Sequence, residues 1–182
     1  FLIFYQIMNI VLTGFMCAGK TTIGRKVAKL LDYNFIDTDI EIEEDQGCSV
    51  EDIFKYGGED CFRDIETKML EKLKNVQNSV ISTGGGIILR EYNQSILKQI
   101  GRQVYLKVPK KELLQRLKKG NNRPLLKNKD SDTDLEQMFN DRSLLYEKAE
   151  CIIETGQQTP QQIASEIVRI ITNMFLVLRP RL

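Results

Sequence analysis

The chain has 182 residues, which is enough for one domain whose core needs no disulfide or metal to support it. Its 26 Lys and Arg residues balance 25 Asp and Glu, and the net charge of +1 argues against nucleic acid or an anionic membrane as the main partner. Histidine is absent, so carboxylates, Lys and Arg must supply any acid–base chemistry. The four cysteines include no C-x-x-C pair, which argues against a disulfide framework or a structural zinc site and favours a reducing, cytoplasmic location.

Both ends of the chain are apolar, but they fall short of the ~20 residues that span a bilayer. The first end also lacks the basic region that opens a secretory signal. Because Met8 opens the first expected strand, residues 1–7 are expected to precede the natural start or to extend that strand. We therefore expect one domain over residues 8–174 and assign no function to the tails at 1–7 and 175–182.

Short apolar runs alternate with helical patterns along the chain, which predicts an α/β fold with a parallel sheet. The strands are expected at residues 10–12, 35–36, 80–82, 104–108 and 151–153. Helices are expected at about 22–31, 50–56, 59–74, 91–100, 110–118, 134–148 and 160–174. Each helix can therefore connect two parallel strands.

The run GFMCAGKT, from Gly14 to Thr21, stands between the first expected strand and the first expected helix. Its glycines let the backbone approach phosphates closely, and its successive N–H groups converge on anionic oxygens. Lys20 can reach the β and γ phosphates, and the Thr21 hydroxyl can ligate Mg²⁺. This P-loop pattern in its strand–loop–helix context predicts a site for a nucleoside triphosphate.

Two acids, Asp37 and Asp39, follow the second expected strand, at the edge of the sheet where ligands bind in open α/β folds. Asp37 can hold Mg²⁺ through water, and Asp39 can accept the proton of an acceptor hydroxyl. Either acid could instead cap the helix that follows, and capping by one is compatible with catalysis by the other.

Three further features are candidates for an acceptor site. Arg63 lies beside an apolar helical stripe and could clamp a substrate carboxylate, or form solvated pairs with Glu59 or Glu66. Gly84-Gly85-Gly86 follows the third strand and offers a wall free of side chains, with exposed N–H groups. Arg142, taken by itself, fits a solvated helix charge better than a catalytic group.

The segment at 118–132 is polar, basic at first and then acidic, and has no helical or strand period. It fits a disordered surface loop, or a mobile lid that closes over a triphosphate and excludes water.

Taken together, the motifs resemble those of the shikimate kinases, small relatives of the nucleoside monophosphate kinases. The match runs from Met8 to about Met174 through GFMCAGKTT, FIDTDIEIE, DIFKYGGEDCFRDIE, VISTGGGI, NRPLL and DRSLLYEKA, in that order. The resemblance implies a three-layer P-loop kinase fold with a five-stranded parallel sheet. It implies transfer of the γ-phosphoryl group of ATP to the 3-hydroxyl of shikimate, with Mg²⁺, in the pathway to chorismate and the aromatic amino acids.

The resemblance also assigns roles. Catalysis falls to Asp39, Lys20 and Arg123, with Arg123 on the lid. ATP binding falls to Cys17, Ala18, Gly19, Lys20, Thr21, Thr22, Arg116, Arg123 and Gln158, with Arg116 against the adenine and Gln158 at its edge. Shikimate binding falls to Asp39, Arg63, Gly84, Gly85, Gly86 and Arg142, supported by Glu66, and Mg²⁺ binding to Thr21 with Asp37. We expect a cytoplasmic monomer with no nucleic-acid or membrane partner.

Two alternatives stay open at this point. The chain could phosphorylate another small acceptor, such as gluconate or a nucleoside monophosphate, or it could be a nucleotide-binding regulatory module without turnover. A nucleotide acceptor needs side chains that read a base, whereas Arg63 and Arg142 suit a small hydroxylated carboxylate.

Cys17 is a departure from the family pattern, which usually has a small residue such as glycine at this position. Its place in the loop predicts a reactive thiol.

Overall fold

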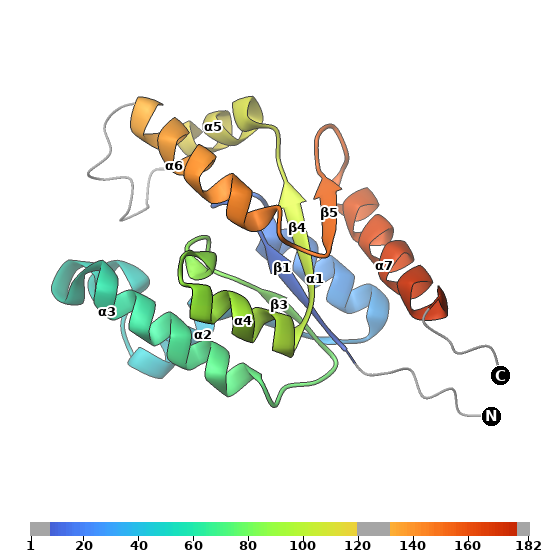
Figure 1. The fold of residues 1–182 in the computed structure, drawn as a ribbon, viewed down its shortest axis with the longest axis horizontal. Coiled ribbons are helices and arrows are strands. Elements are labelled where there is room, and N and C mark those ends of the chain that lie inside the picture. The colour runs from blue at the N-terminus through green and yellow to red at the C-terminus, as the bar shows by residue number, and fades with distance from the viewer. Residues whose placement is uncertain (1–7, 120–131, 178–182) are drawn as a thin grey trace.

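The computed structural model describes residues 8–119 and 132–177. One parallel sheet with the strand order β2-β3-β1-β4-β5 forms the centre (Figure 1). The strands are β1 (Asn9–Thr13), β2 (Asn34–Asp37), β3 (Ser79–Ser82), β4 (Gly101–Lys107) and β5 (Cys151–Glu154). The α-helices are α1 (Lys20–Leu31), α2 (Thr38–Gln46), α3 (Val50–Leu73), α4 (Glu91–Ile100), α5 (Lys110–Lys119), α6 (Asp132–Tyr146) and α7 (Pro160–Val177), and η1 (Ile87–Leu89) is a 3₁₀ helix.

Strand β1 lies at the middle of the sheet and is buried along its whole length. It pairs with β3 on one side, where Val11 faces Ile81, and with β4 on the other, where Leu12 faces Val104. Such continuous burial is expected of a parallel strand covered by helices on both faces. The expected α/β class, with five parallel strands between helices, is confirmed.

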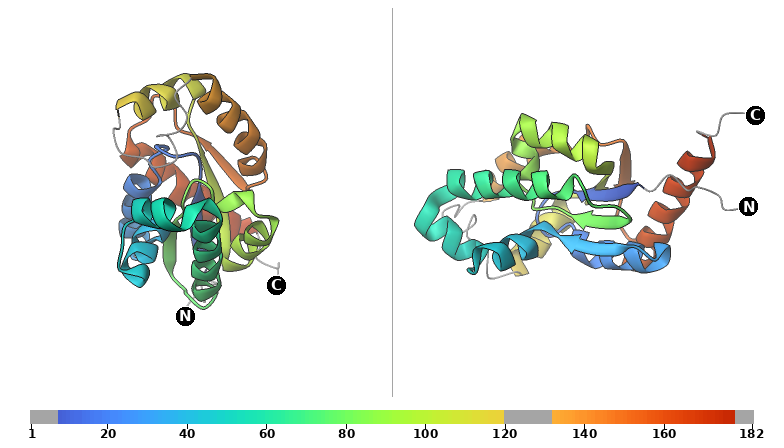
Figure 2. Two further views of the ribbon diagram at one scale, coloured as in Figure 1. Left: turned by 90° about the vertical axis from the view of Figure 1, so that its left-hand side faces the viewer. Right: turned by 90° about the horizontal axis from the view of Figure 1, so that it is seen from below.

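Helices cover both faces of the sheet. Helices α1 and α7 pack against each other on one face, while α3 and α4 lie over the other (Figure 2). Among the described residues, no helix is long and apolar enough to cross a membrane. At its carboxyl end β1 leads into the loop before α1 and β3 into the loop before η1, while β2 runs directly into α2.

Two helical features differ in detail from the expected pattern. Helix α3 contains a break at Gly58, where φ is 76°, a conformation that glycine adopts without strain, and this break separates the two expected helices. Helix α2 has no expected range of its own, because it buries only Thr38 and Ile42 and is otherwise mostly acidic, so it has no apolar stripe to detect.

Candidate active site

The P-loop joins β1 to α1 and takes an unusual backbone conformation. Gly14, Cys17 and Gly19 have φ values of 148°, 62° and 90°. At Gly14 a β-carbon would also come within 3.0 Å of the carbonyl oxygen of Leu106, so this position needs glycine for space as well as for conformation. Gly19 caps the 12-residue helix α1, whose N-terminal N–H groups and dipole favour an anion at this end.

Lys20, the first residue of α1, is buried and reaches back across the loop. Its Nζ donates to the carbonyl oxygens of Gly14 at 2.8 Å and Phe15 at 3.0 Å. The ammonium group is thus held inside the loop, where it can meet phosphate oxygens.

Thr21 and Asp37 meet beside the loop. The Thr21 hydroxyl donates to Oδ2 of Asp37 at 2.7 Å, and Oδ1 of Asp37 accepts from the backbone N–H of Asp39 at 3.2 Å. Asp37 therefore caps α2 with one oxygen and faces the P-loop with the other. A hydroxyl and a carboxylate are hard oxygen donors that fit Mg²⁺. Among the described residues no group of three or more His, Cys, Asp or Glu could hold a metal by itself.

Two cavities of about 370 Å³ each lie at this edge of the sheet. The first is lined by the P-loop residues Cys17, Gly19, Lys20, Thr21 and Thr22, with Asp37. The second is lined by residues of α2, α3 and α6 and by the glycine run, including Arg63, Glu66 and Arg142. Met16, Asp39 and Gly85 line both cavities. A group held in the second cavity can therefore reach a phosphate held in the first beside Asp39.

Arg63 lies within the second cavity and is only 4% exposed, so it does not form the solvated pairs that its spacing allows. Both pairs that the spacing allows do form, but on a buried guanidinium: one with the fully buried Glu66 and one with the half-exposed Glu59 at 2.9 Å. Burial alone would lower the pKa of Arg63, but Glu66 and then Glu59 outweigh it and raise that pKa above its ordinary value. The guanidinium stays charged in the cavity.

Glu66 is a carboxyl group without exposure to solvent. Burial raises its pKa from 4.5 to about 7, the nearby Asp39 adds to this rise, and Arg63 opposes it. Within the described residues, Oε1 of Glu66 accepts no hydrogen bond, while Oε2 accepts from Arg63. A buried acid with an unused oxygen next to Asp39 is typical of a functional site rather than of a stabilising core.

The glycine run is required by close approach of these side chains. A β-carbon at Gly84 would lie 2.7 Å from Oδ1 of Asp39 and 2.8 Å from Oε1 of Glu66, and one at Gly86 would overlap the guanidinium of Arg63. The expected wall without side chains is present. The expectation of exposed N–H groups is wrong for Gly84, whose N–H already donates to Oγ1 of Thr38 at 2.9 Å.

Arg142, on α6, is 6% exposed and so is not the solvated helix charge that it resembles in isolation. Its guanidinium carbon lies 5.7 Å from the centre of the Phe15 ring, and NH1 donates to the carbonyl oxygen of Gly85 at 3.4 Å. Burial lowers its pKa below the ordinary value of Arg. Arg63 and Arg142 thus bring two cations to one cavity.

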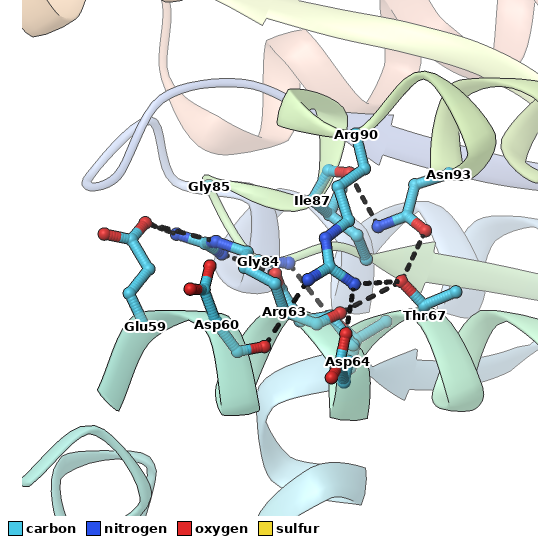
Figure 3. Close-up of polar contacts among 12 residues, drawn as sticks. Glu59, Asp60, Arg63, Asp64, Thr67, Gly84, Gly85, Ile87, Arg90 and Asn93 are labelled. Atoms are coloured by element: carbon cyan, nitrogen blue, oxygen red, sulfur yellow. Dashed lines mark hydrogen bonds and ion pairs between the residues drawn. The ribbon is translucent and has the colours of Figure 1, made fainter. Parts of the chain in front are cut away.

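A polar network holds α3 against the segment that follows the glycine run (Figure 3). Thr67 on α3 lies 2.8 Å from Oδ1 of the buried Asn93, whose Nδ2 donates to the carbonyl oxygen of Ile87 at 3.0 Å. Arg90 donates to Asp64 at 2.6 Å. These contacts connect the helix that carries Arg63 to the segment that follows the glycines.

The other residues expected to contact the nucleotide are found in and around the P-loop, with two exceptions. Arg116 on α5 donates to the carbonyl oxygen of Cys17 at 3.2 Å and so borders the P-loop. Ala18 is buried within the loop, where its N–H donates to Phe15. Gln158 is exposed between β5 and α7 and does not line the P-loop cavity. Arg123 and residues 120–131 of the expected lid lie outside the described residues.

Sequence reasoning missed residues that have no motif of their own. Met16 lines both cavities, Phe54 lines the acceptor side, and the Tyr146 hydroxyl donates to the carbonyl oxygen of Gly85. The spacing of Tyr146, four residues after Arg142, places the two on one helix face and could have indicated a shared role.

A P-loop at the end of the central strand, with a second cationic cavity that shares Asp39 with it, defines a P-loop kinase of a small anionic acceptor. The family model for shikimate kinase matches residues 16–172. A shikimate kinase of Caldicellulosiruptor bescii is 42% identical over 162 residues, which cover 89% of this chain and 94% of that protein. One from Clostridium botulinum is 51% identical over 147 residues, which cover 80% of this chain and 86% of that protein.

Solved structures agree. The structure of shikimate kinase from Acinetobacter baumannii in complex with shikimate has a TM-score of 0.88 and 40% identity, and the match covers 94% of this chain and 96% of that one. The enzyme from Aquifex aeolicus has a TM-score of 0.81 at 30% identity, covering 93% of this chain and 99% of that one. A gluconokinase from Sinorhizobium meliloti, at 15% identity and a TM-score of 0.56, shares the fold alone. This chain belongs to the shikimate kinase family and is an ATP-dependent kinase.

Proposed function

We propose that this protein transfers the γ-phosphoryl group of ATP to the 3-hydroxyl of shikimate, producing shikimate 3-phosphate and ADP. The observation that carries the proposal is the pair of cavities that meet at Met16, Asp39 and Gly85. One is built for polyphosphate, and the other presents two buried arginines to an acid. Family membership supports the same assignment.

The nucleotide side positions and neutralises the phosphates. The N–H groups of the P-loop and the start of α1 face the phosphate oxygens, and Lys20 supplies a positive charge from inside the loop. Thr21 and Asp37 are the residues that would hold Mg²⁺, which when bound would offset the charge of the phosphate oxygens. Because phosphoryl transfer has a loose transition state, positioning and charge account for most of the catalysis.

The acceptor side orients shikimate. Arg63 and Arg142 hold its carboxylate, and the glycine run lets the ring lie close to the backbone. Asp39, at the junction of the cavities, accepts the proton of the attacking hydroxyl. Glu66 keeps Arg63 charged and in place. The assignments of Arg116 and Gln158 to the adenine, and of Arg123 and residues 118–132 to the lid, belong to this proposal as well.

The proposal also includes a cytoplasmic location and a monomeric state. A cytoplasmic location is supported by the free thiols of Cys17, Cys48, Cys61 and Cys151, which fit a reducing compartment. The single domain over residues 8–174 and the monomeric state stay predictions, which limited proteolysis and sedimentation measurements test.

The test is ADP release with a panel of acceptors: shikimate, its analogue without the carboxyl group, gluconate and a nucleoside monophosphate. We expect turnover of shikimate and much weaker turnover of the others. Asp39→Asn should lower kcat by ~10²-fold or more while ATP still binds. Asp45→Asn, on an exposed position of the same helix, is the matched control and should leave kcat unchanged. Equal turnover of the analogue without the carboxyl group would contradict the acceptor assignment.

A further inference from the structure

Arg63 already has two carboxylate partners in the acceptor cavity. Its Nε–H and NH2 groups both donate to Oε1 of Glu59, at 3.3 Å and 2.9 Å, and NH1 donates to Glu66 (Figure 3). The Nε and NH2 donors form one edge of the guanidinium, and such an edge can grip a carboxylate with two parallel hydrogen bonds. In this structure Glu59 occupies that edge.

The other neighbours of the guanidinium have little room to move. Glu66 is fully buried, and the backbone of Gly86 lies so close that a β-carbon there would overlap both terminal nitrogens of Arg63. The Glu59 side chain is different, because it is 51% exposed. Of these three neighbours, only Glu59 can leave for solvent at small cost.

The position of Glu59 in α3 gives its carboxylate a second stabilising interaction. It follows directly on Gly58, whose φ of 76° interrupts the helix, so it starts a new helical segment. A carboxylate in the first turn of a helix is stabilised by the N-terminal dipole, and this stabilisation does not require the contact with Arg63. Glu59 therefore has a favourable place in water once its contact with Arg63 is broken.

We propose that Glu59 is an internal carboxylate that pairs with Arg63 until the carboxylate of the acceptor displaces it. The inference rests on the proposed function and identifies Glu59 as a residue that sets specificity. Arg63 keeps Glu66 and a second carboxylate in both states, so the exchange leaves the charges around the buried cation unchanged. An acceptor without a carboxylate cannot displace Glu59, so the exchange selects for acids.

Displacement of Glu59 by the acceptor and a purely supporting role for Glu59 predict opposite changes in the shikimate KM and Kd of Glu59→Gln. If Glu59 competes with the acceptor, Glu59→Gln removes the competitor and lowers the KM and Kd for shikimate, by about two- to tenfold for a partly exposed charged pair. If Glu59 instead serves to align Arg63, the same substitution raises both values. The amide keeps the size of the side chain, and the position is half exposed, so folding is not at risk.

The experiment measures steady-state kinetics and calorimetric binding for wild type, Glu59→Gln and Asp60→Asn. Asp60 is the adjacent exposed acid on the same helix, and Figure 3 draws no dashed line from its carboxylate to Arg63, so Asp60→Asn controls for a general change of charge. The acceptors are shikimate and its neutral carboxamide. We expect a lower shikimate KM and Kd in Glu59→Gln alone, little change for the carboxamide, and an unaltered ATP KM.

Three results would overturn the inference: an unchanged or higher shikimate KM in Glu59→Gln, the same gain for the carboxamide, or the same gain in Asp60→Asn. The proposed function fails separately. If wild type does not phosphorylate shikimate at all, both fail, whereas shikimate turnover with any of the three results refutes only the role of Glu59.

Discussion

Glu66 should make the stability of this protein fall as pH rises through neutrality. Its pKa is raised by burial from 4.5 to about 7 in the folded state, so the folded chain binds a proton there over a range in which the unfolded chain has released it. Stability contributed by a raised pKa is complete below the unfolded value and is lost as pH rises through the folded value. At 1.36 kcal/mol per pKa unit, the loss from about pH 4 to about pH 8 is roughly 3 kcal/mol.

Glu66→Gln removes this titration without changing the size of the side chain. The amide stays neutral at every pH and can still accept a hydrogen bond from Arg63, although Arg63 loses a counter-charge. That loss shifts the variant's stability by an amount that hardly depends on pH. The difference in unfolding free energy between wild type and variant should therefore drop by roughly 3 kcal/mol over the same range.

Urea unfolding without substrates, at several values of pH, measures this difference. Glu44→Gln, at an exposed position of α2, is the control and should run parallel to wild type at every pH. If the curves for wild type and Glu66→Gln are also parallel, Glu66 does not hold a proton in the folded protein, and the reasoning from its burial is refuted.

Three further outcomes are expected. Gly86→Ala should raise the shikimate KM about tenfold or more, because the new methyl group overlaps the Arg63 guanidinium. Gly156→Ala, where a methyl group enters open space, is the control and should leave the KM unchanged; equal KM values in the two variants would contradict the close packing at Gly86. Alkylation of Cys17 should inactivate the enzyme, because the adduct enters the P-loop cavity, and MgATP should protect the thiol from alkylation. Mass spectrometry locates the adduct, and an enzyme that is labelled at Cys17 but fully active would refute this prediction. Arg123→Ala should lower kcat by ~10²-fold with the fold intact by circular dichroism, and an unchanged kcat would remove Arg123 from catalysis.

The alternation of strands and helices along the chain and the P-loop could be predicted from the sequence, because both depend on short stretches of chain. Buried parallel strands need continuous apolar runs, and the run before Gly14 supplies one. The break in α3 could be located in the same way, since Gly57-Gly58 interrupts the helical pattern. A helix after Asp37 could be expected from its capping acid, but the range of α2 could not be predicted, because its acidic surface gives no period.

The burial of the acceptor-site residues could not be predicted from the sequence around each of them. The spacing of Arg63 with Glu59 and Glu66 is compatible with solvated helix pairs, and nothing in the segment itself indicates that Glu66 is fully buried. That burial comes from packing against the glycine run, about twenty residues later in the chain. Likewise, Arg142 becomes a site residue only because α6 places it over Phe15.

By itself, the sequence determined the order of elements, the phosphate-binding loop and the kinds of side chain available for chemistry, since backbone preferences and motif spacing act over a few residues. Only the tertiary structure decided that Met16, Asp39 and Gly85 join two cavities, that Glu66 holds a raised pKa, and that Glu59 occupies the edge of Arg63. These properties depend on burial and on charges brought together from distant segments. Desolvation and electrostatic interaction are set by three-dimensional distance, which the linear order of residues does not specify.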